Sequence, residues 1–388
     1  MPSQTIPRRD ATFEASALLR RPVWLNLLLL LGSIVIGLVA LELALGLTPY
    51  RYLTHPRVDY PPGYFQNDPD LGADLAPNQP SAMMRMRGPS FVTFTNGLGC
   101  FDHDAPIEGG YVLALGDSST WGYAALDDKW TSHLETLSGH RVLKCGVSGT
   151  GPRFQRLKAA KTIAKVGRNP AIVLVLYDTW NDFNDDMVFP GYGVVEGYRG
   201  HNLKSLDLRT GVVTRYTPEE FEQKYQRYLR RQAQFRLTRT LIENLTTAAL
   251  INHVLTEGPG REAAPADGPI LERRYDFSLW NVDRTRYPWI NQALEGHLDN
   301  LRALKRLAED NGAALVLIAN GIPDAGLHAR LRAFFAEEMP YYVDLAEPIA
   351  RAAKGQRVTW HHDDHWNALG NRLAAEALHE YLKDAGLL

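Results

Sequence analysis

The amino-acid sequence predicts an α/β fold in which a mainly parallel sheet carries helices on both faces, preceded by one transmembrane helix. Three observations lead to this prediction. From about residue 91 onward, short apolar runs alternate with helical segments, an order typical of parallel sheets. Two runs, 171–177 (AIVLVLY) and 313–319 (AALVLIA), are apolar throughout, as strands covered on both faces are. Residues 23–47 are apolar over a length that can cross a bilayer.

The segment 23–47 holds a single charge, Glu42, near its far end. At about 1.5 Å per residue, its 25 residues can cross a hydrocarbon core of about 30 Å. The apolar region of a cleaved signal peptide is usually shorter, about 7–15 residues. We therefore expect a retained anchor, with cleavage near residues 44–46 as the alternative. Arginines are more numerous before the span (Arg8, Arg9, Arg20, Arg21) than after it (Arg51, Arg57), which predicts a cytoplasmic tail at 1–22 and an extracytoplasmic remainder.

The rest of the chain divides into a linking segment and one large domain. Residues 48–90 are rich in Pro, Tyr, Asn and Asp, which indicates a stalk or a loop wrapping the main domain. The domain at 91–388 is interrupted at about 184–290 by a glycine- and tyrosine-rich loop, a charged helix and a polar loop. Because ligands bind beyond the carboxyl ends of parallel strands, this insertion either covers a site or only elaborates the packing.

Within 91–388, each element follows from its local pattern. The first strand, 111–115, is an apolar run before a glycine, and the third, 171–177, lies between Asn-Pro and Asp. The helix at 293–311 ends at a glycine, the residue type that most often terminates helices. Further strands are expected at 140–145, 313–319 and 341–345, and further helices at 128–137, 154–166, 327–337 and 368–384.

Composition and net charge indicate which kinds of binding partner are expected. Hydrophobic residues make up 45% of the chain and charged residues 22%, as in an ordinary globular protein. The formal net charge of −2 gives no basis for nucleic-acid binding, so we expect none.

The two cysteines, Cys100 and Cys145, are too few for a disulfide framework. They could form one bridge in an oxidising compartment. The sequence alone favours two buried free thiols, because pairing cannot be deduced from two isolated positions.

Ser118 is the first candidate for chemistry, because it directly follows the first strand within Gly-Asp-Ser. A serine at that point projects from the carboxyl edge of the sheet, where backbone N–H groups of a starting helix can face an anion. Such a position suits a nucleophile and its oxyanion hole. Taken alone, a Gly-x-Ser turn is more often a simple turn, because both residues favour turns.

A base for this serine is suggested by the C-terminal stretch VTWHHDDHWNALG. His365 follows Asp363 at the spacing Asp-x-His, so the carboxylate can orient one ring nitrogen while the other faces Ser118. A metal site within 361–365 is an alternative, less favoured because adjacent residues of one loop rarely converge on one ion. A helix-capping loop, in which Asn367 caps the last helix and the Asp and His residues are solvated, is the other.

Two further blocks follow strand ends. The second strand leads into CGVSGTGP, which contains Gly149, and the third leads into YDTWNDFND, which contains Asn181. A glycine allows its backbone N–H to approach a substrate closely, and an asparagine side chain offers N–H donors. Together with the Ser118 N–H, these groups would form a three-donor oxyanion hole.

These four blocks, in this order and at these strand ends, resemble the SGNH/GDSL-type hydrolases over about 91–388, with 184–290 poorly covered. The resemblance implies a flavodoxin-like three-layer α/β/α sandwich. It implies Ser118 as nucleophile, His365 as base and Asp363 as its orienting carboxylate. It also implies an oxyanion hole made by the N–H groups of Ser118 and Gly149 and the side chain of Asn181.

The chain departs from the pattern of that family at three positions. His362 stands three residues before His365, where many members have Asp, and Lys144 and Thr179 stand where Asn and Gly are frequent. The block Asp-x-His-Trp-Asn looks more like a membrane-anchored bacterial branch similar to polysaccharide O-acetyltransferases and acetylesterases. That branch implies the bacterial inner membrane, with the domain on the periplasmic side.

The sequence thus predicts a serine-dependent ester hydrolase outside the cytoplasm, acting on acyl (acetyl) esters of envelope carbohydrate or lipid, without metal or organic cofactor. Transfer of the acyl group to a polysaccharide by the same site, and a non-catalytic envelope scaffold, remain alternatives. Aromatic residues of the insertion could stack on sugar rings, although ordinary packing is favoured for most of them. They are Tyr192, Tyr198, Trp280, Tyr287 and Trp289.

Overall fold

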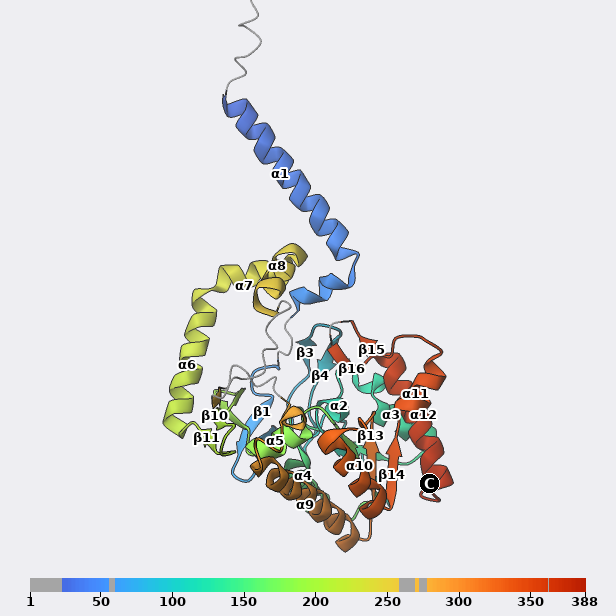
Figure 1. The fold of residues 1–388 in the computed structure, drawn as a ribbon. Helices are drawn as coiled ribbons and strands as arrows, with labels where there is room; N and C mark the ends of the chain where they lie inside the picture. Colours follow the sequence, from blue (N-terminus) through green and yellow to red (C-terminus); the bar gives the residue numbers. More distant parts are fainter. Residues whose placement is uncertain (1–22, 56–59, 258–268, 272–277, 362) are drawn as a thin grey trace, which may run out of the picture.

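The computed structural model describes residues 23–55, 60–257, 269–271, 278–361 and 363–388 (Figure 1). The predicted cytoplasmic tail at 1–22, Arg57 and His362 lie outside these described residues.

A five-stranded parallel sheet forms the centre of the molecule. Its order is β14–β13–β7–β5–β6, so the first of these strands along the chain lies inside the sheet and the order reverses between β5 and β7. This is the flavodoxin-like order, which confirms the predicted fold class. The bounds are β5 Val112–Gly116, β6 Val142–Lys144, β7 Ile172–Tyr177, β13 Ala314–Ala319 and β14 Tyr341–Asp344.

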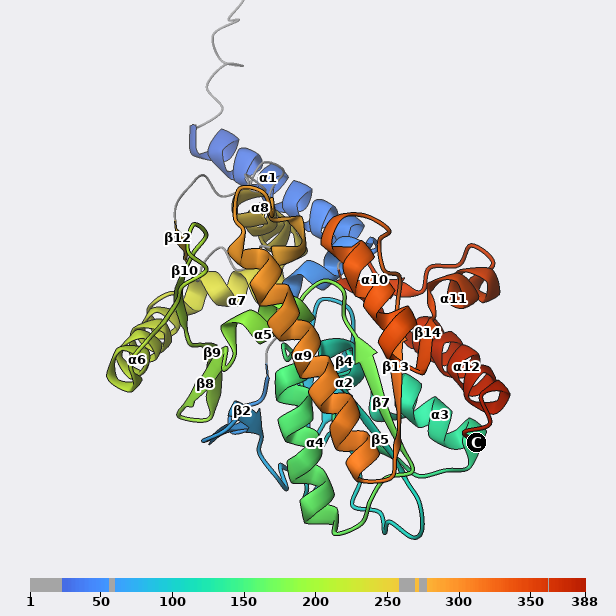
Figure 2. The ribbon, with the colours of Figure 1, turned by 60° about the horizontal axis from the view of Figure 1, so that its bottom comes forward.

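Side chains of successive strand residues enter two separate cores, one on each face. In β5, Leu113 and Leu115 pack with α4, α9 and α10, whereas Val112 and Ala114 pack with α3, α11 and α12. Figure 2 shows α4 and α9 together over one face. The sheet is therefore the middle of three layers. The helices are α3 Trp130–Ser138, α4 Pro152–Val166, α9 Trp289–Asp310, α10 Gly326–Glu338, α11 Ala346–Ala353 and α12 Ala368–Asp384.

The segment between the apolar helix and the sheet folds onto the domain. After α1 (Val23–Gly46) and a short 3-10 helix, η1 (Pro49–Thr54), the chain forms two antiparallel hairpins. A buried ion pair fixes the first hairpin, because Lys158 Nζ of α4 lies 2.8 Å from Asp74 Oδ2 and also donates to the Gly99 carbonyl at 3.0 Å. Residues 65–93 therefore wrap the domain. The hairpin strands are β1 Phe65–Asp68, β2 Gly72–Leu75, β3 Ala82–Arg85 and β4 Ser90–Thr93.

The insertion at about 184–290 contacts two different regions of the domain. The β8–β9 hairpin lies against the loop after β6, whereas η4 and the residues after it pack into the core beside α9. The insertion thus both lines the carboxyl edge of the sheet and elaborates the packing. Its elements, from α5 onward, are α5 Asp182–Val188, β8 Tyr192–Val195, β9 Tyr198–His201, β10 Leu203–Asp207, β11 Val213–Arg215, α6 Pro218–Gln234, α7 Arg236–Asn244, α8 Thr246–Glu257, β12 Pro269–Leu271 and η4 Leu279–Asn281.

Cys100 and Cys145 form a disulfide, so the prediction of two free thiols was wrong. Cys100 precedes β5 and Cys145 follows the neighbouring strand β6, which brings their Cα atoms to 4.6 Å, within bonding range. Both residues are fully buried. The pairing of β5 with β6, which two positions in a sequence do not reveal, decides the outcome.

Replacing both residues by alanine (C100A/C145A) is expected to lower the free energy of unfolding by about 4 kcal/mol, because the bond closes a loop with a sequence separation of 45. Guanidinium unfolding of the purified full chain in detergent, followed by tryptophan fluorescence, measures this change. An unchanged midpoint and slope in the double variant would contradict a stabilising bridge.

Candidate active site

Ser118 lies at the start of α2 (Ser118–Trp121), directly beyond the carboxyl end of β5. The chain can turn there because Gly116 has a φ of +142°, and a Cβ at this position would lie 2.2 Å from Thr120 Oγ1 and 2.8 Å from the Leu176 carbonyl oxygen. Only glycine fits. Asp117 caps the short helix by accepting a hydrogen bond from the Ser119 N–H at 2.8 Å.

The structure brings Ser118, His365 and Asp363 together in one hydrogen-bonded chain. His365 Nε2 lies 2.8 Å from Ser118 Oγ, and His365 Nδ1 is hydrogen-bonded to Asp363 Oδ1. The backbone N–H of His365 also donates to that carboxylate at 2.9 Å. Ser118 is 8% exposed, so the hydroxyl is shielded but still reachable.

His365 and Asp363 sit on a small hairpin of β15 (Thr359–Trp360) and β16 (Asp363–Trp366). Asn367 caps α12 by accepting from the Gly370 N–H at 3.0 Å, and its amide donates to the Thr359 carbonyl at 3.1 Å. The predicted cap is therefore present, but His365 is bonded to Ser118 rather than simply solvated. The ring of Tyr123 meets His365 edge-on at 3.9 Å between centroids, which limits the imidazole's movement.

The metal alternative gains no support from the described residues, in which no group of three or more His, Cys, Asp or Glu side chains is placed to hold an ion. His361 is exposed, and its Nδ1 lies 3.4 Å from the Arg357 guanidinium.

The glycine block after β6 lies beside the Ser118 turn. The Val147 N–H donates to the Gly116 carbonyl at 3.0 Å, which joins the two loops. Gly149 has a φ of +68°, and a Cβ there would lie 2.5 Å from the hydroxyl of Tyr192 in β8. A side chain at this position is thus excluded by both backbone conformation and space.

The block after β7 is tied to the same turn. Ser119 Oγ donates to Asp178 Oδ2 at 3.2 Å. Asn181 Nδ2 donates to Asp185 Oδ2 at 2.7 Å, which uses one of the two N–H groups of that amide. Ser118, Gly149 and Asn181 therefore follow neighbouring strands at the carboxyl edge of the sheet, and Ser118, His365 and Asp363 are joined by hydrogen bonds through His365.

Sequence reasoning missed a cluster of buried carboxylates beside the serine. Burial, followed by the negative charge of Asp178, raises the pKa of Asp117 to about 7. Burial and the charge of Asp117 likewise raise the pKa of Asp182 well above its ordinary range. Ser118 Oγ lies 3.1 Å from Asp117 Oδ2, so its proton has two possible acceptors, Asp117 and His365. Asp117 was visible in the motif, but nothing in the motif indicated its burial.

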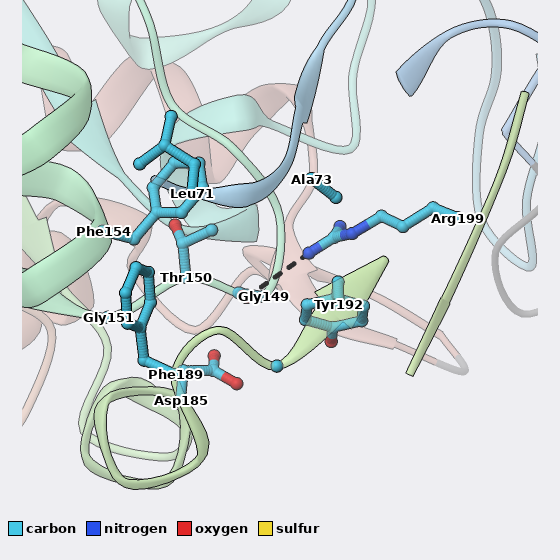
Figure 3. A pocket seen from close by; sticks show the side chains of 11 residues that line it. Leu71, Ala73, Gly149, Thr150, Gly151, Phe154, Asp185, Phe189, Tyr192 and Arg199 are labelled. Atoms are coloured by element: carbon cyan, nitrogen blue, oxygen red, sulfur yellow. Dashed lines mark hydrogen bonds between the residues drawn. The ribbon is translucent and has the colours of Figure 1, made fainter. Parts of the chain in front are cut away.

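A second missed residue, Arg199 of β9, lines a pocket next to Gly149 (Figure 3). Its guanidinium lies over the ring of Tyr192 at 3.5 Å and donates to the Gly149 carbonyl at 3.4 Å. Leu71 and Phe154 form an apolar part of the same lining. The pocket lining thus combines a cation stacked on an aromatic ring with an apolar wall.

The other aromatic residues of the insertion mainly pack. Trp280 and Tyr287 are buried in the core, and Trp289 donates its indole N–H to the Leu208 carbonyl at 2.6 Å. Tyr198 lies beside Tyr225. Of the five aromatic residues considered for sugar stacking, Tyr192 is the one found in the pocket lining.

No protein-family model and no curated protein sequence matches the chain. The solved structures similar to it include a member of the lipolytic protein G-D-S-L family from Veillonella parvula DSM 2008, with 12% identity and a TM-score of 0.34 over 70% of this chain and 97% of that chain. An acetyl xylan esterase from the rumen bacterium Butyrivibrio proteoclasticus has 10% identity and a TM-score of 0.35 over 74% of this chain and 66% of that chain. A two-domain esterase active on acetylated mannans has 12% identity and a TM-score of 0.34 over 71% of this chain and 49% of that chain.

Replacing Asp117 by asparagine (D117N) is expected to make stability less dependent on pH. The folded protein holds this proton up to about pH 7, whereas the unfolded chain releases it near the ordinary value of 3.8. The stability from the neutral buried carboxyl is therefore fully present below about pH 4 and is lost as pH rises through about 7, a change of about 4 kcal/mol at most.

The thermal midpoint of D117N minus that of the parent protein should consequently become more positive between pH 4 and pH 8. Thermal unfolding at closely spaced pH values measures this difference. Loss of the Asp117 charge also lowers the pKa of Asp182, which adds to the difference in the same direction. A difference independent of pH would refute the raised pKa.

Proposed function

We propose that the chain is a serine-dependent ester hydrolase of the SGNH/GDSL type. The single observation that carries the proposal is the hydrogen-bonded chain from Ser118 Oγ through His365 to Asp363, at the carboxyl edge of the sheet. A nucleophile bonded to a base, and a base oriented by a carboxylate, is the arrangement that activates a serine.

In the proposed mechanism, Ser118 Oγ attacks the carbonyl carbon of the ester while its proton passes to His365 Nε2. Asp363 holds the Nδ1–H and stabilises the imidazolium that forms. His365 then gives the proton to the departing alcohol oxygen as the C–O bond breaks, which leaves an acyl group on Ser118. Water attacks that acyl-enzyme with His365 again as base, releasing the carboxylic acid and restoring the serine.

The negative charge on the tetrahedral intermediate would be stabilised by the N–H groups of Ser118 and Gly149 and by the second N–H of the Asn181 amide. The protonation state of Asp117 affects which group accepts the hydroxyl proton of Ser118. Below about pH 7 its carboxyl group is protonated and accepts poorly, so the hydroxyl proton of Ser118 is directed toward His365.

The proposed location is the bacterial inner membrane, crossed once by α1, with the domain on the extracytoplasmic side. The helix is long and apolar enough to cross a bilayer, and its side chains are exposed along its length. The excess of arginines before the span and the Cys100–Cys145 disulfide, typical of an oxidising compartment, support this orientation.

The proposed substrates are acyl (acetyl) esters of envelope carbohydrate or lipid. The pocket beside Gly149, which has the Arg199 cation over the Tyr192 ring in its lining, supports binding of such a molecule. Transfer of the acyl group to a polysaccharide is the second candidate, favoured by the resemblance of the block Asp363-x-His365-Trp366-Asn367. It differs only in the acceptor that attacks the acyl-enzyme.

The variants Ser118→Ala and His365→Ala are expected to lose at least about 10³-fold in kcat for p-nitrophenyl acetate, because each removes a member of a unit that acts together. His361→Ala is the matched control: it removes an exposed histidine from the same hairpin and should keep the parent rate. Thermal midpoints verify folding. Undiminished turnover in either site variant would refute the mechanism.

A fluorophosphonate probe distinguishes an enzyme from a non-catalytic scaffold that has kept the fold. The parent protein is expected to be labelled at Ser118, because only an activated serine reacts with such a probe, and Ser118→Ala should remain unlabelled. Mass spectrometry of the labelled peptide identifies the site. A folded parent protein that is not labelled would favour the scaffold.

A further inference from the structure

The helices α7 and α8 present apolar side chains that the rest of the described chain leaves uncovered. Leu237 is 75% exposed and Leu255 is 74% exposed, values that resemble those of the α1 side chains. Further exposed apolar residues on or beside these helices are Phe235, Leu241, Ile251 and Val254. Soluble surfaces rarely carry such a concentration of apolar side chains without a partner.

The spacing of these residues gives each helix one apolar face. In α7 and directly after it, Leu237, Leu241 and Leu245 recur at every fourth position. In α8, Ile251, Val254 and Leu255 follow the i, i+3, i+4 pattern. Both are therefore amphipathic helices whose apolar side has no protein cover in the described residues.

Hydrogen bonds between α1 and α8 fix the position of α8 along the axis of α1. The carboxylate of Glu42, in the last turns of α1, accepts hydrogen bonds from the backbone N–H groups of Thr246 and Thr247, the latter at 2.9 Å. A carboxylate is a favourable partner for a helix N-terminus. Glu42 lies four residues before the end of α1, which corresponds to about 6 Å along the helix axis. The start of α8 is therefore held at the level of the last turn of the span, not above it.

Basic side chains accompany these apolar faces. Arg230, Arg231 and Arg236 are exposed at the end of α6 and the start of α7. Figure 1 shows this end of α6 toward α1, whereas its other end lies near β10 and β11. Arginines beside an apolar helix face suit the headgroup layer of a membrane that contains anionic phospholipid.

We propose that α7 and α8 lie in the outer interface of the same bilayer that α1 spans, with their apolar faces among the lipid acyl chains. The proposal rests on the membrane span that is part of the proposed function, and it adds a second attachment. The Glu42 contact, the apolar faces and the arginines together favour a lipid surface over a second protein as the occupant.

The test compares two valines with the same exposed fraction, 58%, in the full chain reconstituted into nanodiscs of neutral and anionic phospholipid. Val254→Cys places a thiol on α8, and Val212→Cys places one in the turn between β10 and β11. Each is labelled with bimane, while the native cysteines stay in their buried disulfide. Ile36→Cys in α1 reports on the span itself.

We expect brominated lipid to quench bimane roughly twofold or more at positions 254 and 36, and aqueous iodide to quench it at position 212. Quenching by brominated lipid at 36, combined with iodide quenching at 254, would overturn the proposal and leave the span intact. Protection of 254 from both quenchers would overturn it in favour of contact with a second copy. A label at 36 that lipid does not quench would refute the span, and with it this proposal, without affecting the esterase assignment.

Discussion

The site depends on one geometric constraint: strands that run parallel all end at the same edge of their sheet. Because β5, β6 and β7 are neighbours, the loops that follow them meet there, although their residues lie far apart in the sequence. The order of strands reverses between β5 and β7, and open parallel sheets generally bind their ligands at such a point. The turn at Gly116 places Ser118 at this edge of the sheet. The β15–β16 hairpin, from the C-terminal part of the chain, brings His365 within hydrogen-bonding distance of Ser118.

Much of this arrangement could be predicted, because the three inner strands β5, β7 and β13 are buried on both faces and appear as unbroken apolar runs. The blocks that contain Ser118, Gly149 and Asn181 could be predicted because each follows a strand of the sheet, and Asp363 and His365 because of their spacing before the last helix. The hairpins at 65–93 could not, since their strands are four residues long and hold polar residues such as those of Gln66-Asn67-Asp68. The ion pair between Lys158 and Asp74 holds the first hairpin. These residues lie far apart in the sequence, so no local sequence pattern predicts their contact.

The same limit applies to the chemistry of the site. The motif Gly-Asp-Ser predicted the position of Ser118, but the raised pKa of Asp117 comes from burial and from Asp178, which directly follows the neighbouring strand β7. The disulfide and the place of Arg199 likewise depend on which strands and hairpins become neighbours. Crowding of carboxylates around Ser118 opposes stability, and such conflicts between local chemistry and folding are characteristic of functional sites.

The ion pair between Lys158 and Asp74 also limits how far the domain can lie from the end of α1. Residues 47–64 separate the end of α1 from the clamped hairpin, and even fully extended they would span roughly 60 Å. Part of this segment is folded in η1, and the Gly63 N–H donates to the Gly197 carbonyl at 2.9 Å, so the free tether is shorter still. For a chain whose α1 crosses a bilayer, this segment therefore sets an upper limit on the distance between Ser118 and the membrane surface. Under the proposed function, an ester substrate would have to come within that distance of the membrane to meet Ser118.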